Sequence, residues 1–279
     1  MLRTRLATAA VALPLLVWLV IWNPWSLFIW LVAGATLVGV TEYSAMAFPD
    51  SRLDRLFSIA AGALLLATMF EPTQERFAMA LAAVVVSGLI IGLFRSDEQR
   101  HAAEALGLTL LGILYVAFLL PHYAWMHGLP DPQFPRTAID VPPGGWRWVT
   151  FTIVVAMSGD VGGYFGGRYF GRRKLMPSVS PGKTVEGSIG SVLSNMVGGV
   201  VCKLVFFQAL GWGEVIGLSL AAGSLSQVGD LCESKIKRSF GAKDSGWIIP
   251  GHGGVLDRID SLVFPAPLVY YYARFFFGY

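Results

Sequence analysis

The chain of 279 residues is unusually apolar, because 54% of its residues are hydrophobic and only 14% are charged. Soluble domains carry about 25% charged residues, so this composition excludes an ordinary soluble domain and predicts an integral membrane protein. The formal net charge is +3. The Lys and Arg residues are distributed as membrane topology requires, so no nucleic-acid partner is expected.

Nine segments approach the roughly 20 apolar residues that a helix needs to span a bilayer. They are residues 8–23, 27–48, 56–70, 77–94, 105–121, 148–167, 187–207, 213–231 and 261–278. The first follows Arg3 and Arg5 as a signal peptide would, but no convincing cleavage site comes after it, so an uncleaved helix is expected. The predicted fold is an all-α integral membrane protein of about nine transmembrane helices.

The distribution of basic residues predicts the orientation of these helices. With the N-terminus in the cytoplasm, the other side and the span ends hold only five of the 21 Lys and Arg residues, namely Arg76, Arg136, Arg147, Lys203 and Arg274. The remaining 16 fall in cytoplasmic segments, which is a strong positive-inside bias. We therefore expect a multi-pass protein with a cytoplasmic N-terminus.

Three regions differ in composition. Residues 1–121 form five hydrophobic spans, residues 122–147 a Pro- and Gly-rich external loop, and residues 148–279 four more polar spans with two basic cytoplasmic loops. His122 and His127 are expected at a surface or interface. Cys202 and Cys232 lack metal-ligand spacing and are interpreted as small packing residues. No internal repeat is evident, which disfavours many transporter folds.

The eighth span carries a polar stripe. Ser226, Asp230 and Ser234 are four residues apart and share one helix face, with Lys237 close to the same line. A carboxylate inside a membrane is costly unless it is paired, hydrated or bound to a metal. A seam that packs helices together is the alternative interpretation.

A glycine-rich turn precedes two further carboxylates. Residues 251–254 read Gly-His-Gly-Gly, which allows a sharp turn and close approach of a ligand. Asp257 and Asp260 would lie on one side of a helix beginning near Val255. Mg²⁺ prefers oxygen ligands and substrate phosphates, so Asp230 and Asp257 are expected to share such an ion. The alternative is an acidic first helical turn that stabilises the helix dipole.

A third polar region joins the sixth and seventh spans. Asp160 lies in an apolar run and is a functional candidate for that reason. Ser180 and Pro181 have the form of an N-cap and the first helical residue, and Lys183 beside such a helix terminus would favour an anion. The basic residues 172–174 either bind substrate or contact anionic lipid.

These polar residues resemble the signature of a known family, the bacterial phosphatidate cytidylyltransferases (CDP-diacylglycerol synthases). The matching run is Ser234-x-Ile236-Lys237-Arg238-x4-Lys243-Asp244-x-Gly246-x2-Ile249-Pro250-x-His252-Gly253-Gly254-Val255-x-Asp257-Arg258-Ile259-Asp260. Upstream, residues 160–168 and 180–187 are also similar, with small departures at Gly163 and Ser191. The first five spans agree with the family only in hydrophobic character and number.

The resemblance implies an enzyme that makes CDP-diacylglycerol and pyrophosphate from CTP and phosphatidic acid. It implies Mg²⁺, with a second cation as an option, a homodimer, and a polar cavity at the cytoplasmic side of the C-terminal helices in the bacterial inner membrane. Because the phosphatidate oxygen is already anionic, catalysis would rest on positioning and electrostatics.

Roles follow for individual residues. The expected catalytic residues are Asp230, Ser234, Lys237, Asp257 and Asp260, of which the three aspartates are the metal-ligand candidates. The expected substrate-binding residues are Asp160, Ser180, Lys183, Thr184, Glu186, Arg238, Lys243, Asp244, His252, Gly253, Gly254 and Arg258. Lys183 with Ser180 and Thr184 would hold either the phosphatidate head or a CTP phosphate.

Two other functions remain open at this point. A CTP-dependent enzyme acting on another lipid, such as a polyprenol kinase or an archaeol-type cytidylyltransferase, would use similar residues. An ion-coupled transporter would need polar residues through the full membrane thickness, whereas here they gather in the cytoplasmic half of the last four spans.

Overall fold

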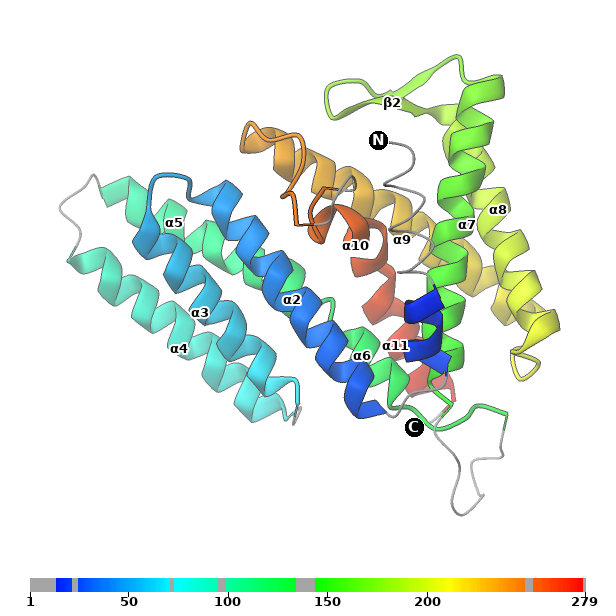
Figure 1. Ribbon diagram of the computed structural model, residues 1–279, viewed down its shortest axis with the longest axis horizontal. Helices are drawn as coiled ribbons and strands as arrows, with labels where there is room; N and C mark the ends of the chain where they lie inside the picture. Colours follow the sequence, from blue (N-terminus) through cyan, green and yellow to red (C-terminus); the bar gives the residue numbers. More distant parts are fainter. Residues whose placement is uncertain are drawn as a thin grey trace.

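The computed structural model describes residues 14–21, 25–70, 73–94, 99–133, 144–248 and 253–277. Residues 14–21 are helical, and the rest of the predicted span 8–23 lies largely outside the described residues. The elements that follow (Figure 1) are α2 (Trp25–Ala47), α3 (Arg52–Thr68), α4 (Gln74–Leu93), α5 (Gln99–Gly112), the π-helical segment η1 (Ile113–Phe118), α6 (His122–His127), α7 (Trp146–Phe170), β1 (Lys174–Met176), β2 (Ser180–Thr184), α8 (Val185–Val205), α9 (Trp212–Ser239), α10 (Leu256–Val263) and α11 (Pro265–Phe276).

Six helical runs among the described residues are long and apolar enough to cross a membrane. They are Leu27–Ala47, Gln74–Leu93, Ala102–His127, Trp146–Phe170, Val185–Val205 and Trp212–Ser239. The protein is therefore a multi-pass helical membrane protein, as predicted. The predicted span at 56–70 corresponds to α3, which has 17 residues.

The last predicted span, 261–278, is not one straight helix. The chain forms α10 and then α11, which has 12 residues, and Phe264 separates them. Pro265 is the first residue of α11. Because proline has no backbone N–H and its ring crowds the preceding turn, the helical hydrogen-bond pattern is interrupted there. α10 begins at Leu256, as expected for a helix beginning near Val255, and not at residue 261, where the last span was predicted to start.

The predicted external loop begins with helix rather than irregular chain. α5, η1 and α6 form a continuous run that ends at His127. His122 and His127 are 0% and 5% exposed, so their expected surface position is wrong. The reason is that α6 packs against α2, α7 and α11, and His127 Nε2 lies 2.8 Å from the carbonyl oxygen of Val20.

The helices form two groups joined through the middle of the molecule. α2 to α5 pack together on one side, α7 to α9 on the other, and α6, α10 and α11 lie between them (Figure 1). α2 contacts α3, η1, α6 and α10, so it reaches from the first group to the C-terminal helices. This placement brings residues of the N-terminal half beside the signature segment.

A two-stranded hairpin joins α7 and α8 and departs from the predicted all-α fold. β1 and β2 pair antiparallel, with Lys174 opposite Thr184 and Met176 opposite Ser180. Ser180 therefore begins a strand and is not the predicted N-cap. The N-cap of α8 is Thr184, whose Oγ1 accepts a hydrogen bond from the N–H of Gly187. The threonine hydroxyl satisfies one of the N–H groups left free at the helix start.

α7 and α8 pack closely because small residues line their interface. A Cβ atom on Gly187 would lie 2.8 Å from the carbonyl oxygen of Gly163, and one on Gly190 would lie 2.8 Å from that of Gly162. Such contacts require glycine and allow the two backbones to approach. The outer face of α8 exposes apolar side chains at nearly every fourth position, which are Ile189, Leu193, Val197, Val201 and Val205.

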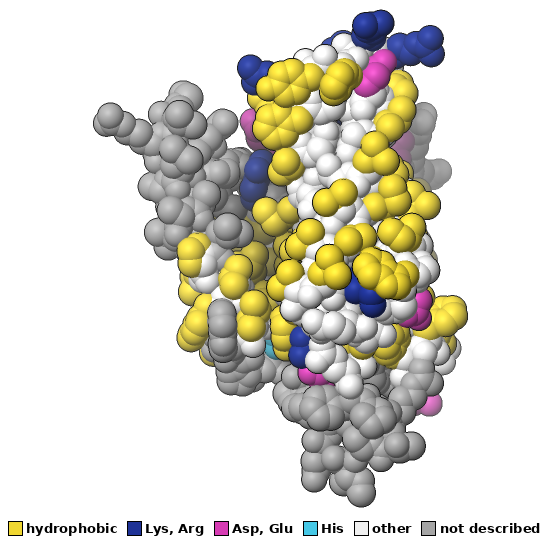
Figure 2. Space-filling view, turned by 90° about the vertical axis from the view of Figure 1, so that its right-hand side faces the viewer, with side chains coloured by type: hydrophobic (Ala, Val, Ile, Leu, Met, Phe, Trp, Pro, Cys, Tyr) yellow, Lys and Arg dark blue, Asp and Glu magenta, His cyan; other side chains and the backbone are white. Residues whose placement is uncertain are grey.

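This outer face has the character of a lipid-facing surface. Figure 2 shows apolar side chains distributed along its length, with Lys and Arg side chains at its upper end and further ones lower on the same face. That upper end carries the β1–β2 hairpin. Three basic residues at the start of the hairpin, Arg172, Arg173 and Lys174, are exposed. Apolar length flanked by basic residues is typical of a segment that crosses a bilayer.

Candidate active site

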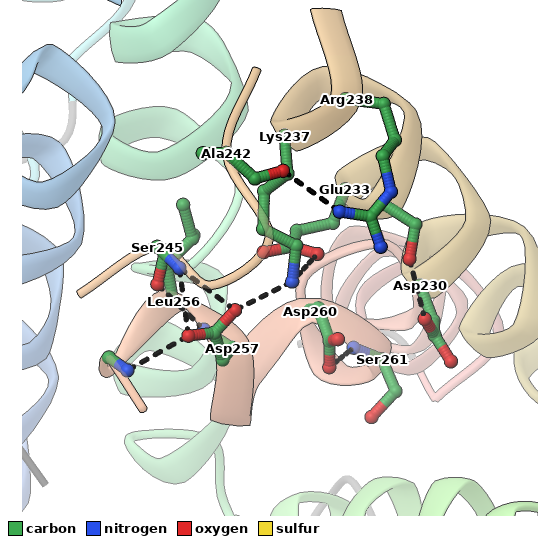
Figure 3. Close-up of polar contacts among 12 residues, drawn as sticks. Asp230, Glu233, Lys237, Arg238, Ala242, Ser245, Leu256, Asp257, Asp260 and Ser261 are labelled. Atoms are coloured by element: carbon green, nitrogen blue, oxygen red, sulfur yellow. Dashed lines mark hydrogen bonds and ion pairs between the residues drawn. The ribbon is translucent and has the colours of Figure 1, made fainter. Parts of the chain in front are cut away.

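Asp257 is fixed at the start of α10 by donors from three directions. Its Oδ2 accepts hydrogen bonds from the backbone N–H groups of Gly254 at 2.8 Å and Ser245 at 2.9 Å. Its Oδ1 lies 2.6 Å from Lys237 Nζ. The residue is 8% exposed. Figure 3 shows its carboxylate between Ser245 and Lys237. The helix and the acidic residue at its first turn agree with the sequence-based expectation.

Lys237 joins two acidic residues from different helices. Its ammonium lies 2.6 Å from Glu233 Oε2, one turn earlier on α9, and 2.6 Å from Asp257 Oδ1 on α10. Glu233 is 1% exposed and Lys237 8%. A buried charge is tolerated when it is paired, and here one cation serves two carboxylates. Lys237 was expected to be catalytic, and in this structure it joins α9 to α10.

The electrostatics of Asp257 and Asp260 differ although they are three residues apart. For Asp257, burial works to raise the pKa, but the hydrogen bonds from Lys237, Gly254 and Ser245 outweigh it and hold the pKa below its usual value. Burial, with the nearby charges of Asp230 and Glu233, raises the pKa of Asp260 to about 7. Asp260 lies against α9, since a Cβ atom on Gly229 of that helix would be 2.8 Å from the Asp260 carbonyl oxygen.

Asp230 lies one turn before Ser234 on α9 and faces the hairpin. Its Oδ2 is 2.5 Å from Nζ of Lys183 on β2, and the Ser234 hydroxyl lies 3.5 Å from its Oδ1. The Asp230 side chain is 26% exposed. The stripe predicted on α9 is thus present, and the structure adds Lys183 as the partner of Asp230.

A cavity of about 510 Å³ lies where α7, α8, α9 and the hairpin meet. Glycines of α7 and α8 form much of its wall, and the polar groups at its lining come from four elements. Those polar and charged residues are Asp160, Tyr164, Arg168, Lys183, Thr184, Ser188, Ser191, Gln227 and Asp230. The cavity therefore brings together Asp160 and Lys183, which were expected to bind substrate, and Asp230, which was expected to bind a metal ion.

Asp160 takes part in the same charge arrangement. It is exposed to the cavity and interacts electrostatically with Asp230, Lys183 and Arg258. Two carboxylates and a lysine from α7, α9 and the hairpin thus line one cavity, and Arg258 of α10 adds a positive charge near Asp160. Such an arrangement suits a ligand that combines phosphate groups with a bound cation.

Three residues assigned to substrate near the hairpin have structural contacts. Glu186 accepts hydrogen bonds from the backbone N–H groups of Arg172 at 3.0 Å and Arg173 at 3.2 Å. Thr184 caps α8, and Ser180 begins β2. Glu186 and Thr184 therefore fix the hairpin that carries Lys183, and they position that lysine in this structure.

The charged residues among the other expected substrate residues surround the cluster without being buried in it. Arg238, Lys243, Asp244 and Arg258 are exposed, and Arg238 donates a hydrogen bond to the carbonyl oxygen of Ala242 at 2.9 Å. Gly253 has a φ of +84°, which favours glycine, and Gly254 is buried. His252 lies outside the described residues.

Three participating residues lie outside the sets of catalytic and substrate-binding residues expected from the sequence. Glu233 pairs with Lys237, and its position four residues earlier was the available signal, since that spacing favours an ion pair on a helix. Ser245 contacts Asp257 through its backbone N–H and its hydroxyl. Glu42, isolated in an apolar span, accepts hydrogen bonds from Ser245 Oγ and from the N–H groups of Val255 and Leu256.

The candidate metal ligands do not form a closed protein cage. Among the described residues, no three His, Cys, Asp or Glu side chains are grouped to hold a metal ion by themselves. Mg²⁺ is often bound by one or two carboxylates together with water and substrate phosphates. Asp230 fits this role, because its side chain is partly exposed and, among the described residues, its Oδ1 has only the Ser234 hydroxyl, at the limit of hydrogen bonding. Both oxygens of Asp257 already accept hydrogen bonds.

Comparison with known proteins agrees with this arrangement. The model of the Cytidylyltransferase family matches residues 3–276. A phosphatidate cytidylyltransferase from Brucella suis is 37% identical over 236 residues, covering 79% of this chain and 84% of its relative. One from Bacillus subtilis is 40% identical over 132 residues, covering 47% and 49%. An uncharacterized Escherichia coli protein, YnbB, is 41% identical over 169 residues, covering 59% and 52%. The chain belongs to the cytidylyltransferase family of membrane nucleotidyltransferases.

Proposed function

We propose that the protein is a phosphatidate cytidylyltransferase, which converts CTP and phosphatidic acid to CDP-diacylglycerol and pyrophosphate. The observation that carries the proposal is the Lys183–Asp230 pair at a cavity among apolar, membrane-spanning helices. A phosphorylated lipid needs both a cationic contact for its head and an apolar path for its chains. The curated relatives named phosphatidate cytidylyltransferase support the same substrate class.

The proposed reaction is a displacement at phosphorus. An oxygen of the phosphatidate phosphate attacks the α-phosphorus of CTP, the bond from that phosphorus to the bridging oxygen breaks, and pyrophosphate leaves with the bonding electron pair. The attacking oxygen is already anionic, so no strong base is required. The task of the protein is to bring two polyanions together and to stabilise the charge on the leaving group.

Basic side chains at two places in the structure would contact the phosphate groups. Lys183 offers an ammonium at the cavity, where it would contact a phosphate when its bond to Asp230 is exchanged. The exposed Arg238, Lys243 and Arg258 lie around the same end of α9 and α10 and would neutralise the triphosphate. His252 and the neighbouring glycines would shape the nucleotide pocket. Arg and Lys are the usual partners of phosphate oxygens.

We further propose that Asp230 and Asp257 bind Mg²⁺, with Asp260 as a third ligand or a hydrogen-bonding neighbour and with room for a second cation. Asp257 would join by exchanging its contact with Lys237. When bound, Mg²⁺ would neutralise phosphate charge and orient the triphosphate. The lysine thus freed would lie beside the same phosphates.

The orientation proposed from the basic residues places the hairpin and α10 at the cytoplasmic face of a bacterial inner membrane, where CTP is available. Phosphatidate would enter sideways between helices from the adjoining leaflet. The homodimer implied by the family resemblance remains part of the proposal.

The test is incorporation of radiolabelled CTP into lipid by the purified protein. We expect labelled CDP-diacylglycerol with phosphatidate, and none after Mg²⁺ is removed with EDTA until Mg²⁺ is restored. Polyprenol, polyprenyl phosphate and an archaeol-type phosphate serve as competing acceptors in parallel reactions. Preference for any of these over phosphatidate would contradict the proposed acceptor, and activity in EDTA would contradict the metal requirement.

A further inference from the structure

Glu42 is a buried carboxylate from the N-terminal half that contacts the segment carrying Asp257. It lies on α2 and is 5% exposed. Its Oε1 accepts a hydrogen bond from the N–H of Val255 at 2.9 Å, and its Oε2 accepts one from the N–H of Leu256 at 2.8 Å. These N–H groups belong to the start of α10, whose first turn lacks helical partners for them. Glu42 therefore caps a helix more than 200 residues away in sequence.

Ser245 connects Glu42 with Asp257. The Ser245 hydroxyl donates to Glu42 Oε2 at 3.2 Å and accepts from the N–H of Asp257 at 3.3 Å. The N–H of Ser245 in turn donates to Asp257 Oδ2 at 2.9 Å. The two carboxylates thus hold the same short segment from opposite sides, one from α2 and one from α10. Displacement of Glu42 would release Ser245 and, through it, a donor to Asp257.

Two glycines of the signature make room for the Glu42 carboxylate. A Cβ atom on Gly246 would lie 2.7 Å from Glu42 Oε1, and one on Gly254 would lie 2.5 Å from Oε2. Real Cβ atoms do not approach other atoms so closely. Both glycines therefore have a packing role toward α2, in addition to any contact with substrate.

The charge of Glu42 is stabilised by hydrogen-bond donors and by the helix dipole. Among the described residues, no Lys or Arg side chain forms an ion pair with it. A buried carboxylate without such compensation would be strongly disfavoured. The positive end of α10 and three hydrogen bonds supply that compensation here.

From this geometry we infer that Glu42 is a positioning residue for the cytidylyltransferase reaction: it fixes the segment around Ser245 and the start of α10, and so holds Asp257 in its functional orientation. That Glu42 fixes the start of α10 follows from the hydrogen-bond geometry. That this supports turnover rests on the proposed function. This role gives the N-terminal spans a part in the site, which their weak similarity to the family did not suggest.

The variants separate the effect of side-chain length from the effect of charge. Glu42→Gln keeps the length of the side chain and a carbonyl oxygen that accepts from α10, whereas Glu42→Asp keeps the charge but is one methylene shorter. Glu42→Ala removes both. Ser44→Ala is the matched control, because Ser44 is buried on the same helix and, within the described part of the chain, its hydroxyl bonds only to the carbonyl oxygen of Thr41.

The first measurement is hydrogen exchange of the full-length protein in lipid nanodiscs, without substrate. We expect amides of Val255 and Leu256 to exchange about tenfold faster in Glu42→Ala, as loss of a charge-assisted hydrogen bond would allow. Peptides of α7 and α8 should be unchanged, as should all peptides of Ser44→Ala. Unchanged exchange at the start of α10, or equal acceleration throughout the molecule, would overturn the inference.

The second measurement is turnover of the same preparations. If positioning is the role, kcat should fall about tenfold or more in Glu42→Ala and Glu42→Asp, and Glu42→Gln should retain more activity than Glu42→Asp. Greater retention in Glu42→Asp would assign the effect to charge and overturn the positioning role. Should Glu42→Ala not fold, Glu42→Gln and Ser245→Ala carry the same comparison. An inactive wild-type protein with locally accelerated exchange in the variants would refute the proposed function alone.

Discussion

The ammonium of Lys183 on the β1–β2 hairpin lies 2.5 Å from Oδ2 of Asp230 on α9. This ion pair joins two segments 47 residues apart at the lining of the cavity. Both side chains are about one quarter to one third exposed, at 30% for Lys183 and 26% for Asp230. A pair at this level of exposure is only weakly stabilising, so each partner can exchange the other for an ion or a phosphate.

Lys183→Ala should lower kcat/KM by about 100-fold, the scale observed when one preorganised electrostatic donor is lost, and should change the melting temperature little. Steady-state kinetics of the purified enzyme and a thermal unfolding curve provide the two measurements. Lys235→Ala is the control, because Lys235 is an exposed lysine on α9 near Asp230 but outside the cavity lining. A similar loss of activity in both variants would show that only the overall charge matters.

Asp257→Asn should reduce turnover by at least about 100-fold while the protein still folds. The amide cannot accept from Lys237 and Ser245 as the carboxylate does, but Glu233 remains as a partner for the lysine. Loss of the buried hydrogen bonds should lower the free energy of unfolding by about 1–3 kcal/mol. Kinetics and chemical unfolding in one detergent check both values, with Glu75→Gln at the exposed start of α4 as control. Near-normal turnover would remove Asp257 from the proposed metal site.

Gly190→Ala should destabilise the protein by about 1–3 kcal/mol, because its new methyl group would meet the carbonyl oxygen of Gly162 at 2.8 Å and force α7 and α8 apart. Gly217→Ala on α9 is the matched control. No atom lies within 4 Å of a Cβ at that position, so the change should be neutral or stabilising by about 0.5–1 kcal/mol. Unfolding curves of the two variants in the same detergent give the two changes in the free energy of unfolding. Equal changes would contradict close packing of α7 and α8.

Arg172→Cys and Gln208→Cys should be labelled from opposite sides of the membrane, because α8 separates these two exposed positions. In a background without Cys202 and Cys232, an impermeant maleimide should reach residue 172 only from the cytoplasmic face and residue 208 only from the other. Labelling in right-side-out and inverted vesicles provides the measurement. Reaction of both positions from one face would contradict the proposed topology.

Local sequence was sufficient for the membrane character and for much of the chemistry. Apolar length determines which segments can enter a bilayer, and α2, α4, α7, α8 and α9 appear where the apolar runs predicted them. The i, i+4 spacing of Asp230 and Ser234 and the acidic first turn of α10 are likewise local properties of a helix. The family signature lies in one continuous segment and was therefore visible without a structure.

Other features depended on contacts that no local pattern contains. The strand at Ser180 forms because β1 pairs with it, although Ser-Pro resembled a helix start. His122 is buried because α6 packs against α2 and α11, although its neighbours in sequence suggested a loop. In both cases the tertiary environment outweighed the local preference.

By itself, the sequence determined that this chain crosses a membrane repeatedly and that its polar chemistry gathers near α9 and α10. Only the tertiary structure decided which charges meet: Lys183 with Asp230, Lys237 with Asp257, and Glu42 with the start of α10. The physical reason is that a charge removed wholly or partly from water needs a partner to offset the lost hydration, and these partners come from segments 20 to 214 residues apart. The packing of α2 against α10 brings Glu42 to the start of that helix, and the packing of α9 against α10 brings Lys237 to Asp257.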